Sequence, residues 1–550
     1  MTPVTGQLAL VLHAHLPFVR HPEHSSFYEE TWLFEAITEC YLPLLRMMDG
    51  WTRDGLPWRL SLTLTPTLCV MLDDPLLQSR YAQHLESLLG LAEKELERTH
   101  FDPARQALVR FYLERLLEAR SGERGARNEE TGSVLGRLAE HQRNGNLEIL
   151  TCAATHALLP LLTGEPSSIR AQLGVAVMDY QRRFGRPASG IWLPECAWSA
   201  DVGPYLRGAG LRWFITETHA LLRAKPQPRA ATFAPVITPD GLAAFARDPA
   251  SARQVWSRRE GYPGDARYRE FHRDLAHEAE WTYVQPHLAT DQRTFTGFKY
   301  HRVTGANVPA EAKELYDRTA ALSAVAEHAA HFVEQRALQC TTATPLLRRP
   351  PLLVAPYDAE LFGHWWFEGP EFLDAVVRRV ASGMDGLTLT TPGEYLRQFP
   401  THQQAIPAAS SWGEGGHLGV WLDESNAWMQ PPLRAAAARM TALADHFASD
   451  VTDDLIERGL RQAGRELLLA QASDWPFLVK MGTAGDYPAR RFREHVENFN
   501  RLAEALESSV AESLRSALEP LEARNNLFAD LDWRWWCGRK PAHGVSERTR

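Results

Sequence analysis

Short apolar runs separated by helical stretches form the pattern of the first four hundred residues. Gln7–Leu12 predicts a buried strand, and Trp58–Leu64 and Leu147–Thr151 predict two more. The later strand candidates are Gly190–Leu193, Trp213–Thr216, Ala231–Ile237, Leu242–Phe245, Pro351–Ala355 and Gly386–Thr391. Strands that alternate with helices at this spacing predict a parallel α/β barrel, whose active site lies at the carboxyl ends of the strands.

Two regions depart from this alternation. Residues 72–142 carry apolar positions at three- and four-residue spacing without a strand, which predicts a helical insertion. From about residue 400 the chain predicts long amphipathic helices at Leu433–Phe447, Thr452–Gln471 and Pro488–Ser508. We therefore expect a catalytic barrel at 1–400 interrupted by 72–142, a C-terminal helical domain at 401–535 and a disordered tail at 536–550.

A carboxylate follows two of the expected strands. Gly190–Leu193 runs into Pro194 and Glu195, and the same order of apolar run, proline and acid recurs at Asp358. Proline has no backbone donor for a further ladder bond, so each acid should lie near a strand end. Cleaving the acetal bond between two sugars needs one group to protonate the leaving oxygen and one to capture the cationic carbon, and two carboxylates do this. Capping a helix or pairing with arginine is the alternative role for Glu195.

Histidine and tryptophan gather near the other expected strand ends and loops. His13 and His15 end the first strand on one face, where they suit a metal ion or sugar hydroxyls. The Gly- and Trp-rich stretch Ser410–Trp428 is a loop candidate. Tyr262 lies among Pro and Gly in a second loop candidate, where it either guides an acceptor and excludes water or packs the loop down.

The amino-acid composition limits the classes of molecule that this chain is expected to bind. The chain has 550 residues, a net charge of −9 and no long basic run, which argues against nucleic acid or an anionic membrane as the partner and favours a neutral substrate. Its 17 Trp exceed what a core of this size needs, and flat apolar faces suit sugars, although core packing is the ordinary role. Six Cys without a CxxC pair and an N-terminal apolar run too short for a signal predict a cytoplasmic protein with reduced thiols.

Five segments in order resemble the motif regions of family 57 of the glycoside hydrolases, and within it the 1,4-α-glucan branching enzymes. They are His13–Pro17, Gly145–Ile149, Trp192–Trp198, Tyr357–Gly363 and Ser411–Asn426. The resemblance, which covers about residues 5–535, implies a distorted (β/α)7 barrel with a helical insertion and a C-terminal helical domain. It also implies an α-1,4-glucan such as amylose or a glycogen-like polymer as donor and acceptor, a role in glycogen biosynthesis, and no metal or organic cofactor.

The resemblance also implies roles for single residues. Glu195 would be the nucleophile and Asp358 the general acid/base. The implied substrate-binding residues are His13 and His15 in the donor subsite, Trp412 and Trp421 on the acceptor side, and, from looser motifs, Trp281, Asp474 and Tyr262. The chain departs from the family pattern at Gln430-Pro431-Pro432, where an aromatic residue and a histidine are expected.

Several alternatives share parts of this pattern. A 4-α-glucanotransferase or an α-amylase-type hydrolase would use the same two carboxylates, and the motifs around them do not separate these activities. The paired histidines also suit a metal-dependent polysaccharide deacetylase, which would need an added acidic ligand. A non-catalytic glucan-binding protein would keep the tryptophan faces but has no need for both acids. Branch length, the ratio of hydrolysis to transfer, and oligomeric state are left open by the sequence.

Overall fold

The computed structural model describes residues 5–126, 133–257, 260–305, 307–448, 453–508 and 510–538. Within these ranges, no helix has both the length and the apolar character needed to cross a membrane. The disordered tail expected at 536–550 lies outside the described residues from 539 onward.

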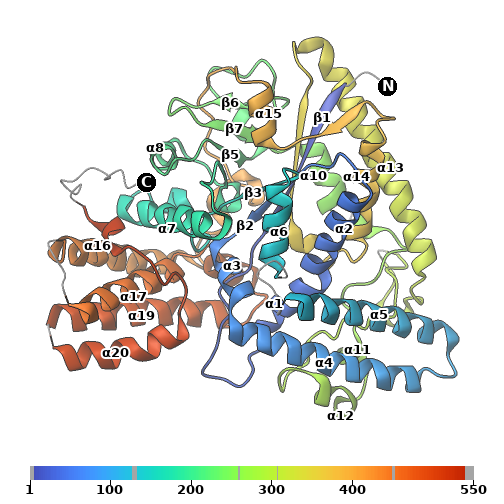
Figure 1. The fold of residues 1–550 in the computed structure, drawn as a ribbon, viewed down its shortest axis with the longest axis horizontal. Coiled ribbons are helices and arrows are strands. Elements are labelled where there is room, and N and C mark those ends of the chain that lie inside the picture. The colour runs from blue at the N-terminus through green and yellow to red at the C-terminus, as the bar shows by residue number, and fades with distance from the viewer. Residues whose placement is uncertain are drawn as a thin grey trace.

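Two sheets form the centre of the molecule (Figure 1). The first has the order β3 (Leu147–Leu150), β2 (Leu60–Leu64), β1 (Gly6–Ala14) and β8 (Leu352–Asp358), with β9 (Leu387–Leu389) pairing with the start of β1. The second has the order β4 (Gly190–Trp192), β5 (Trp213–Thr216), β7 (Ala243–Ala246) and β6 (Val236–Ile237). All pairs are parallel except β6 with β7. Every residue of β1 is buried, as expected of a strand covered on both faces.

A few backbone hydrogen bonds join the two sheets into a barrel. The Trp192 amide donates to the Thr151 carbonyl at 2.9 Å, which joins β3 to β4, and the Asp248 amide donates to the Val354 carbonyl at 2.7 Å, which joins β7 to β8. The parallel strands therefore follow one another as β1, β2, β3, β4, β5, β7 and β8, and β8 pairs with β1 again. The expected distorted (β/α)7 barrel is confirmed. It is distorted between β3 and β4 and between β7 and β8, where few backbone hydrogen bonds join the strands.

The helical insertion begins earlier than its apolar periodicity indicated. It contains α3 (Pro66–Asp73), α4 (Pro75–Arg98), α5 (Pro103–Ala126) and α6 (Val134–Arg143). Thr65 starts α3 by accepting a hydrogen bond from the Leu68 amide, and Asp74 caps α4 through the Leu76 and Leu77 amides. Figure 1 shows α4 and α5 as an antiparallel pair along the lower edge of the molecule.

The strand expected at Ala231–Ile237 is wrong over most of its length. Only Val236–Ile237 is extended, because Ala231 has a left-handed backbone with φ +48° and the residues after it turn. A long excursion separates β7 from β8 and contains α10 (Pro249–Trp256), α11 (Leu275–Glu278), α12 (Trp281–Val284) and α13 (Arg318–Ala343). The remaining barrel helices are α1 (Glu30–Ala36), α2 (Leu42–Arg53), α7 (Pro166–Phe184), α8 (Gly203–Gly208), α9 (Thr218–Leu222), α14 (Gly369–Ala381) and α15 (Pro392–Gln398).

The C-terminal helices stack beside the barrel next to α7 (Figure 1). They are α16 (Gln430–His446), α17 (Asp454–Ala470), α18 (Asp474–Met481), α19 (Tyr487–Ser508) and α20 (Ala511–Arg524). Gln430-Pro431-Pro432 forms the first turn of α16, where backbone amides have no helical partner and proline is tolerated. Trp535 packs against Gly174 of α7 and Trp536 against Gly464 of α17, so the end of the described chain is anchored.

Candidate active site

Glu195 lies just beyond β4 in a conformation that non-glycine residues rarely adopt. Its φ is +62°, and Cys196 follows with φ +49°. Such backbone strain in a buried turn is typical of functional sites. The Glu195 carboxylate accepts hydrogen bonds from Trp412 Nε1 at 2.7 Å on Oε2 and from Ser473 Oγ at 2.9 Å on Oε1. The strained turn therefore holds a buried carboxylate against two donors from distant parts of the chain.

A chain of hydrogen bonds leads from Glu195 back to the first strand. Ser473 Oγ is 2.8 Å from His156 Nδ1, and His156 Nε2 is 3.0 Å from His13 Nε2. Because Ser473 donates to Glu195, its oxygen accepts from His156 Nδ1–H, and His156 Nε2 in turn accepts from His13 Nε2–H. Burial and the His15 charge lower the pKa of both His13 and His156, so both rings are neutral as this order requires.

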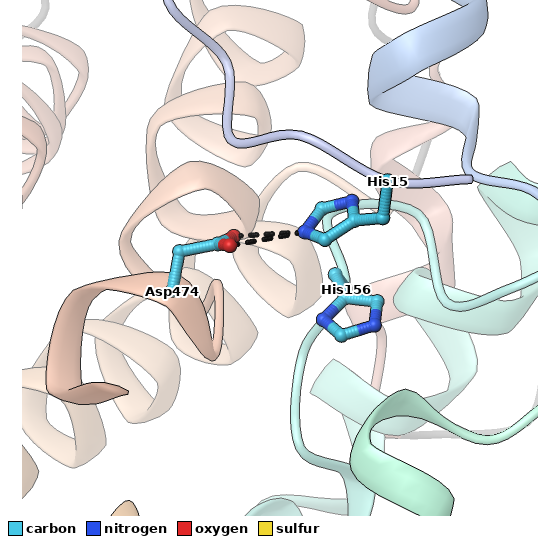
Figure 2. Close-up of side chains that lie close together, drawn as sticks. All are labelled: His15, His156 and Asp474. Atoms are coloured by element: carbon cyan, nitrogen blue, oxygen red, sulfur yellow. Dashed lines mark hydrogen bonds and ion pairs between the residues drawn. The ribbon is translucent and has the colours of Figure 1, made fainter. Parts of the chain in front are cut away.

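A second histidine of β1 contacts the C-terminal domain. His15 Nε2 lies 3.0 Å and 3.1 Å from the two oxygens of Asp474, at the start of α18 (Figure 2). Its Nδ1 lies 3.0 Å from Thr65 Oγ1. Burial acts to lower the pKa of His15, but the charge and hydrogen bond of Asp474 outweigh it and raise that pKa. The pair is thus an ion pair that fixes the C-terminal domain against the barrel.

His15, His156 and Asp474 also offer ligand atoms that all lie within 4.8 Å of one another, as expected of a possible metal site. The two imidazole rings, however, are stacked with centroids 3.9 Å apart and planes 15° apart. An imidazole nitrogen binds a metal in the plane of its own ring, so nearly parallel rings do not direct their lone pairs at one point. Both Asp474 oxygens also lie within hydrogen-bond distance of His15. The cluster fits hydrogen bonding better than tetrahedral metal coordination.

Asp358 ends β8 directly beside His13, its register partner in β1. Among the described residues, none donates a hydrogen bond to its carboxylate. Burial raises the pKa of Asp358 well above its ordinary value, and the neighbouring carboxylates of Glu360 and Glu195 raise it further. Arg247 opposes this in part but is already paired with Glu217 at 2.8 Å. These surroundings favour the protonated form of Asp358 over its ionised form.

Burial also raises the pKa of Glu195, to about 7, but its surroundings differ. The hydrogen bonds from Trp412 and Ser473 and the charge of His15 all favour its ionised form and hold the pKa at that value. The environments of the two strand-end acids thus differ, because hydrogen-bond donors favour the anion of Glu195, whereas burial and neighbouring carboxylates favour the protonated form of Asp358.

The structure separates the other expected site residues into two groups. His13, His15, Asp474 and Trp412 gather with Glu195: the Trp412 ring packs edge-on to Trp192 at 5.1 Å, and Trp192 stacks on His13 at 4.6 Å. The second group consists of three further aromatic residues.

Trp421, Trp281 and Tyr262 have packing partners instead. Trp421 is 1% exposed and lies beneath Gly413, so it supports the loop of Trp412. Trp281 begins α12, which Figure 1 shows at the lower edge below α4. The Tyr262 hydroxyl lies 2.8 Å from His331 Nδ1 on α13, and its ring stacks on His328. Of the two roles considered for Tyr262, its contacts in this structure are those of packing.

Three residues of the site had no strong signal in the sequence. His156 has φ +56° and follows β3 after an irregular turn, and Ser473 stands between two helices of the C-terminal domain. Arg247, which follows β7, places its guanidinium 5.9 Å from the Trp412 ring. A polar residue shortly after a strand was the available signal for His156 and Arg247.

Comparisons with known proteins agree with this geometry. Residues 9–339 match the model of glycosyl hydrolase family 57, and residues 432–536 match that of the 1,4-α-glucan branching enzyme C-terminal domain. A 1,4-α-glucan branching enzyme of Thermococcus kodakarensis is 32% identical over 95% of this chain and 77% of its own length. Its crystal structure, in complex with glucose and additives, matches with a TM-score of 0.87 over 98% of this chain and 97% of that chain.

A further solved structure is also similar over nearly the whole chain. The α-amylase AmyC from Thermotoga maritima is 38% identical and matches with a TM-score of 0.89, covering 98% of this chain and 100% of its own. Taken together with the barrel and its two strand-end acids, these matches show that the chain belongs to glycosyl hydrolase family 57.

Proposed function

We propose that this chain is a 1,4-α-glucan branching enzyme that works by retaining double displacement. The observation that carries the proposal is the contrast between Glu195, which accepts two hydrogen bonds, and Asp358, which is buried beside other carboxylates. A retaining enzyme needs one ionised nucleophile and one protonated acid, and these two environments supply them. The match of residues 432–536 to the branching-enzyme C-terminal domain supports branching as the outcome.

The first step breaks an α-1,4 bond inside a glucan. A Glu195 oxygen bonds to the anomeric carbon while the bond from that carbon to the departing O4 breaks. Asp358 gives its proton to O4, so the leaving chain departs as a neutral alcohol and Asp358 becomes ionised. Glu195 loses its negative charge in forming the ester, which in turn relieves the repulsion that raises the Asp358 pKa. This change prepares Asp358 to act as a base.

The second step transfers the covalently held segment. The 6-hydroxyl of an acceptor glucan gives its proton to Asp358, and its oxygen displaces Glu195 from the anomeric carbon. The product is an α-1,6 branch, and Glu195 and Asp358 return to their starting states. Two inversions give net retention. Trp412 donates to Glu195, and the neutral His13 stands edge-on to the Trp412 ring, so the apolar faces of these rings help to keep water from the ester.

We also propose an α-1,4-glucan, such as amylose or a glycogen-like polymer, as both donor and acceptor, and a place in glycogen biosynthesis. His13, His15, Asp474 and Trp412 would contact the sugar in this scheme. Trp421, Trp281 and Tyr262 would reach it only if the loops that carry them moved. All six cysteines are free, which supports a reducing compartment such as the cytoplasm.

Hydrolysis is the second candidate, and one observation favours it. The α-amylase of Thermotoga maritima is 38% identical to this chain, more than the 32% of the Thermococcus branching enzyme structure. A hydrolase would use the same first step and let water, in place of a sugar hydroxyl, give its proton to Asp358. The two activities therefore differ only in what reaches the ester.

Linkage analysis of amylose treated with the enzyme separates these outcomes. We expect new α-1,6 linkages with few new reducing ends, and neither product from Glu195→Gln or Asp358→Asn. Reducing ends that rise without α-1,6 linkages would favour the hydrolase. Wild-type activity in either variant would overturn the assignment of the carboxylates. Glu507→Gln, which changes a half-exposed carboxylate on α19 that is paired with Arg439, is the matched control.

A further inference from the structure

An exposed tryptophan lies in the loop that follows β8, at the same end of the strand as Asp358. Trp365 is 58% exposed, whereas the next residue, Trp366, is 2% exposed. The Trp365 amide donates to the Glu360 carbonyl at 3.3 Å, and the Glu360 carboxylate accepts from the His15 amide at 3.2 Å. This loop is therefore tied to the strand ends that form the candidate active site.

Trp365 belongs to a group of rings with fixed positions. The Phe271 ring stacks on it with centroids 4.7 Å apart and planes 24° apart, and His364 stands edge-on to both rings. Lys299 Nζ lies 4.2 Å from the Phe271 ring centroid and donates to the Phe271 carbonyl at 2.6 Å. His364 Nδ1 lies 2.7 Å from Glu39 Oε2. We call Trp365, Phe271, His364 and Lys299 the Trp365 platform.

One exposed apolar side chain is ordinary on a protein surface, but this arrangement is not a lone side chain. Phe271 stacks on one face of the Trp365 ring, and the Trp365 side chain is still more than half exposed. A flat indole face held in place matches the apolar face of a pyranose ring at little cost in side-chain entropy. The Glu35 carboxylate, 3.7 Å from His364 Nδ1, supplies a polar group near the rings for sugar hydroxyls, while the buried Lys299 holds Phe271 in place.

We propose that the Trp365 platform is a subsite for an α-1,4-glucan segment remote from the bond that is broken. This inference rests on the proposed function, because the ligand is the same polymer and the platform lies on the loop that continues from Asp358. A polymer that passes the carboxylates extends over several sugars, so a second aromatic contact at this end of the barrel lengthens the chain that the enzyme holds. The platform should therefore favour long glucans over short ones.

The test measures glucan binding without turnover. In a Glu195→Gln parent, affinity electrophoresis through gels that contain amylose gives a dissociation constant for each variant. We expect Trp365→Ala to weaken amylose binding by about 3- to 10-fold, the loss typical of one stacked aromatic contact. Trp365→Tyr should keep most of the affinity. Phe101→Ala removes a 95% exposed ring from the α4–α5 turn and serves as the matched control, with affinity equal to that of the parent.

Competition with a short maltooligosaccharide then separates the platform from the reaction centre. We expect Trp365→Ala to lose more affinity for amylose than for the short sugar. Trp365→Leu, which keeps an apolar contact with Phe271 but lacks a flat face, should behave like the alanine variant. Equal amylose binding in Trp365→Ala and the parent, or an equal loss in Phe101→Ala, would overturn the inference. A wild-type enzyme that forms no α-1,6 linkage would instead overturn the branching function and leave this binding result intact.

Discussion

Ser473 Oγ lies 2.9 Å from Glu195 Oε1 and 2.8 Å from His156 Nδ1, so a serine of the C-terminal domain joins the carboxylate at the end of β4 to the histidine pair of the barrel. Its own amide donates to the His156 carbonyl at 3.1 Å. Two hydrogen bonds thus hold Ser473 to His156, and its hydroxyl donates to Glu195. The C-terminal domain therefore contributes a residue to the candidate active site.

Removing this hydroxyl should impair the nucleophile without removing it. In Ser473→Ala the Glu195 carboxylate loses one of its two donors, and the His156 Nδ1–H loses its acceptor. We expect kcat/KM on amylose to fall by about 10- to 100-fold, the effect of losing one hydrogen bond to a charged group. Ser473→Thr keeps the hydroxyl and should retain most of the activity. If Ser473→Ala were as active as wild type, the hydrogen bonds from Ser473 to Glu195 and His156 would have no role in the reaction.

The pH dependence of the reaction should reflect the two carboxylates. Glu195 must be ionised to attack, and burial raises its pKa to about 7, so kcat/KM should fall as the pH drops below about 7. Asp358 must be protonated, and burial and the neighbouring carboxylates raise its pKa, so the alkaline limb should lie above the range of an ordinary aspartate. Trp412→Phe removes the donor that most lowers the Glu195 pKa, so its acidic limb should move to higher pH. If the acidic limb of the wild-type enzyme lay near the pKa of an ordinary carboxyl group, the raised pKa of Glu195 would be wrong.

Part of this site could be predicted from the sequence because the signals are local. Glu195 and Asp358 each follow an apolar run and a proline, and His13 ends the first strand, so strand periodicity alone places them at one end of a barrel. His156 and Ser473 are 317 positions apart and meet in irregular backbone, one of them with a positive φ. No periodicity describes either residue, and their contact exists only after the C-terminal domain packs on the barrel.

The aromatic residues show a different limit. Trp412 and Trp421 come from the same loop, yet Trp412 contacts Glu195 while Trp421 is buried beneath Gly413. Sequence composition cannot distinguish a ring that binds sugar from one that supports the loop, since both roles favour tryptophan. The same ambiguity applies to Tyr262, whose hydroxyl contacts His331 on α13. The role of each ring depends on whether it is exposed in the folded chain, and this exposure depends on contacts between residues far apart in the sequence.

Azide should distinguish the roles of the two acids. In Glu195→Ala a space replaces the nucleophile, and azide in that space attacks the anomeric carbon of a substrate with a good leaving group, which gives an inverted glycosyl azide. In Asp358→Ala the covalent ester still forms on Glu195, and azide then displaces it, which gives a product of retained configuration. Nuclear magnetic resonance of the products reads the configuration. The opposite pairing of variant and product would exchange the two roles.

A chelator should leave the activity unchanged. The rings of His15 and His156 are stacked 3.9 Å apart, and Asp474 is held by His15, so this cluster has a hydrogen-bonding role in the proposed mechanism. We expect the rate of branching after prolonged treatment with excess chelator to equal that of the untreated enzyme. A loss of activity that added zinc restores would contradict this reading and favour a metal held by these residues.

Gly363, in the loop that follows Asp358, should be essential for the folding of that loop. Gly363 has φ +119°, and a Cβ there would lie 1.8 Å from the Glu39 carbonyl oxygen, in the π-helical turn Ile37–Tyr41. Gly363→Ala therefore forces the β8 loop away from that turn, and we expect a loss of about 3–5 kcal/mol in unfolding free energy. Gly383→Ala is the matched control, because its φ is +71° but no atom lies within 4 Å of the added Cβ, so only the backbone strain of about 1–2 kcal/mol applies. Thermal unfolding of both variants gives the comparison. Equal midpoints would show that the loop yields without cost and that its contact with Glu39 does not hold the Asp358 strand end in place.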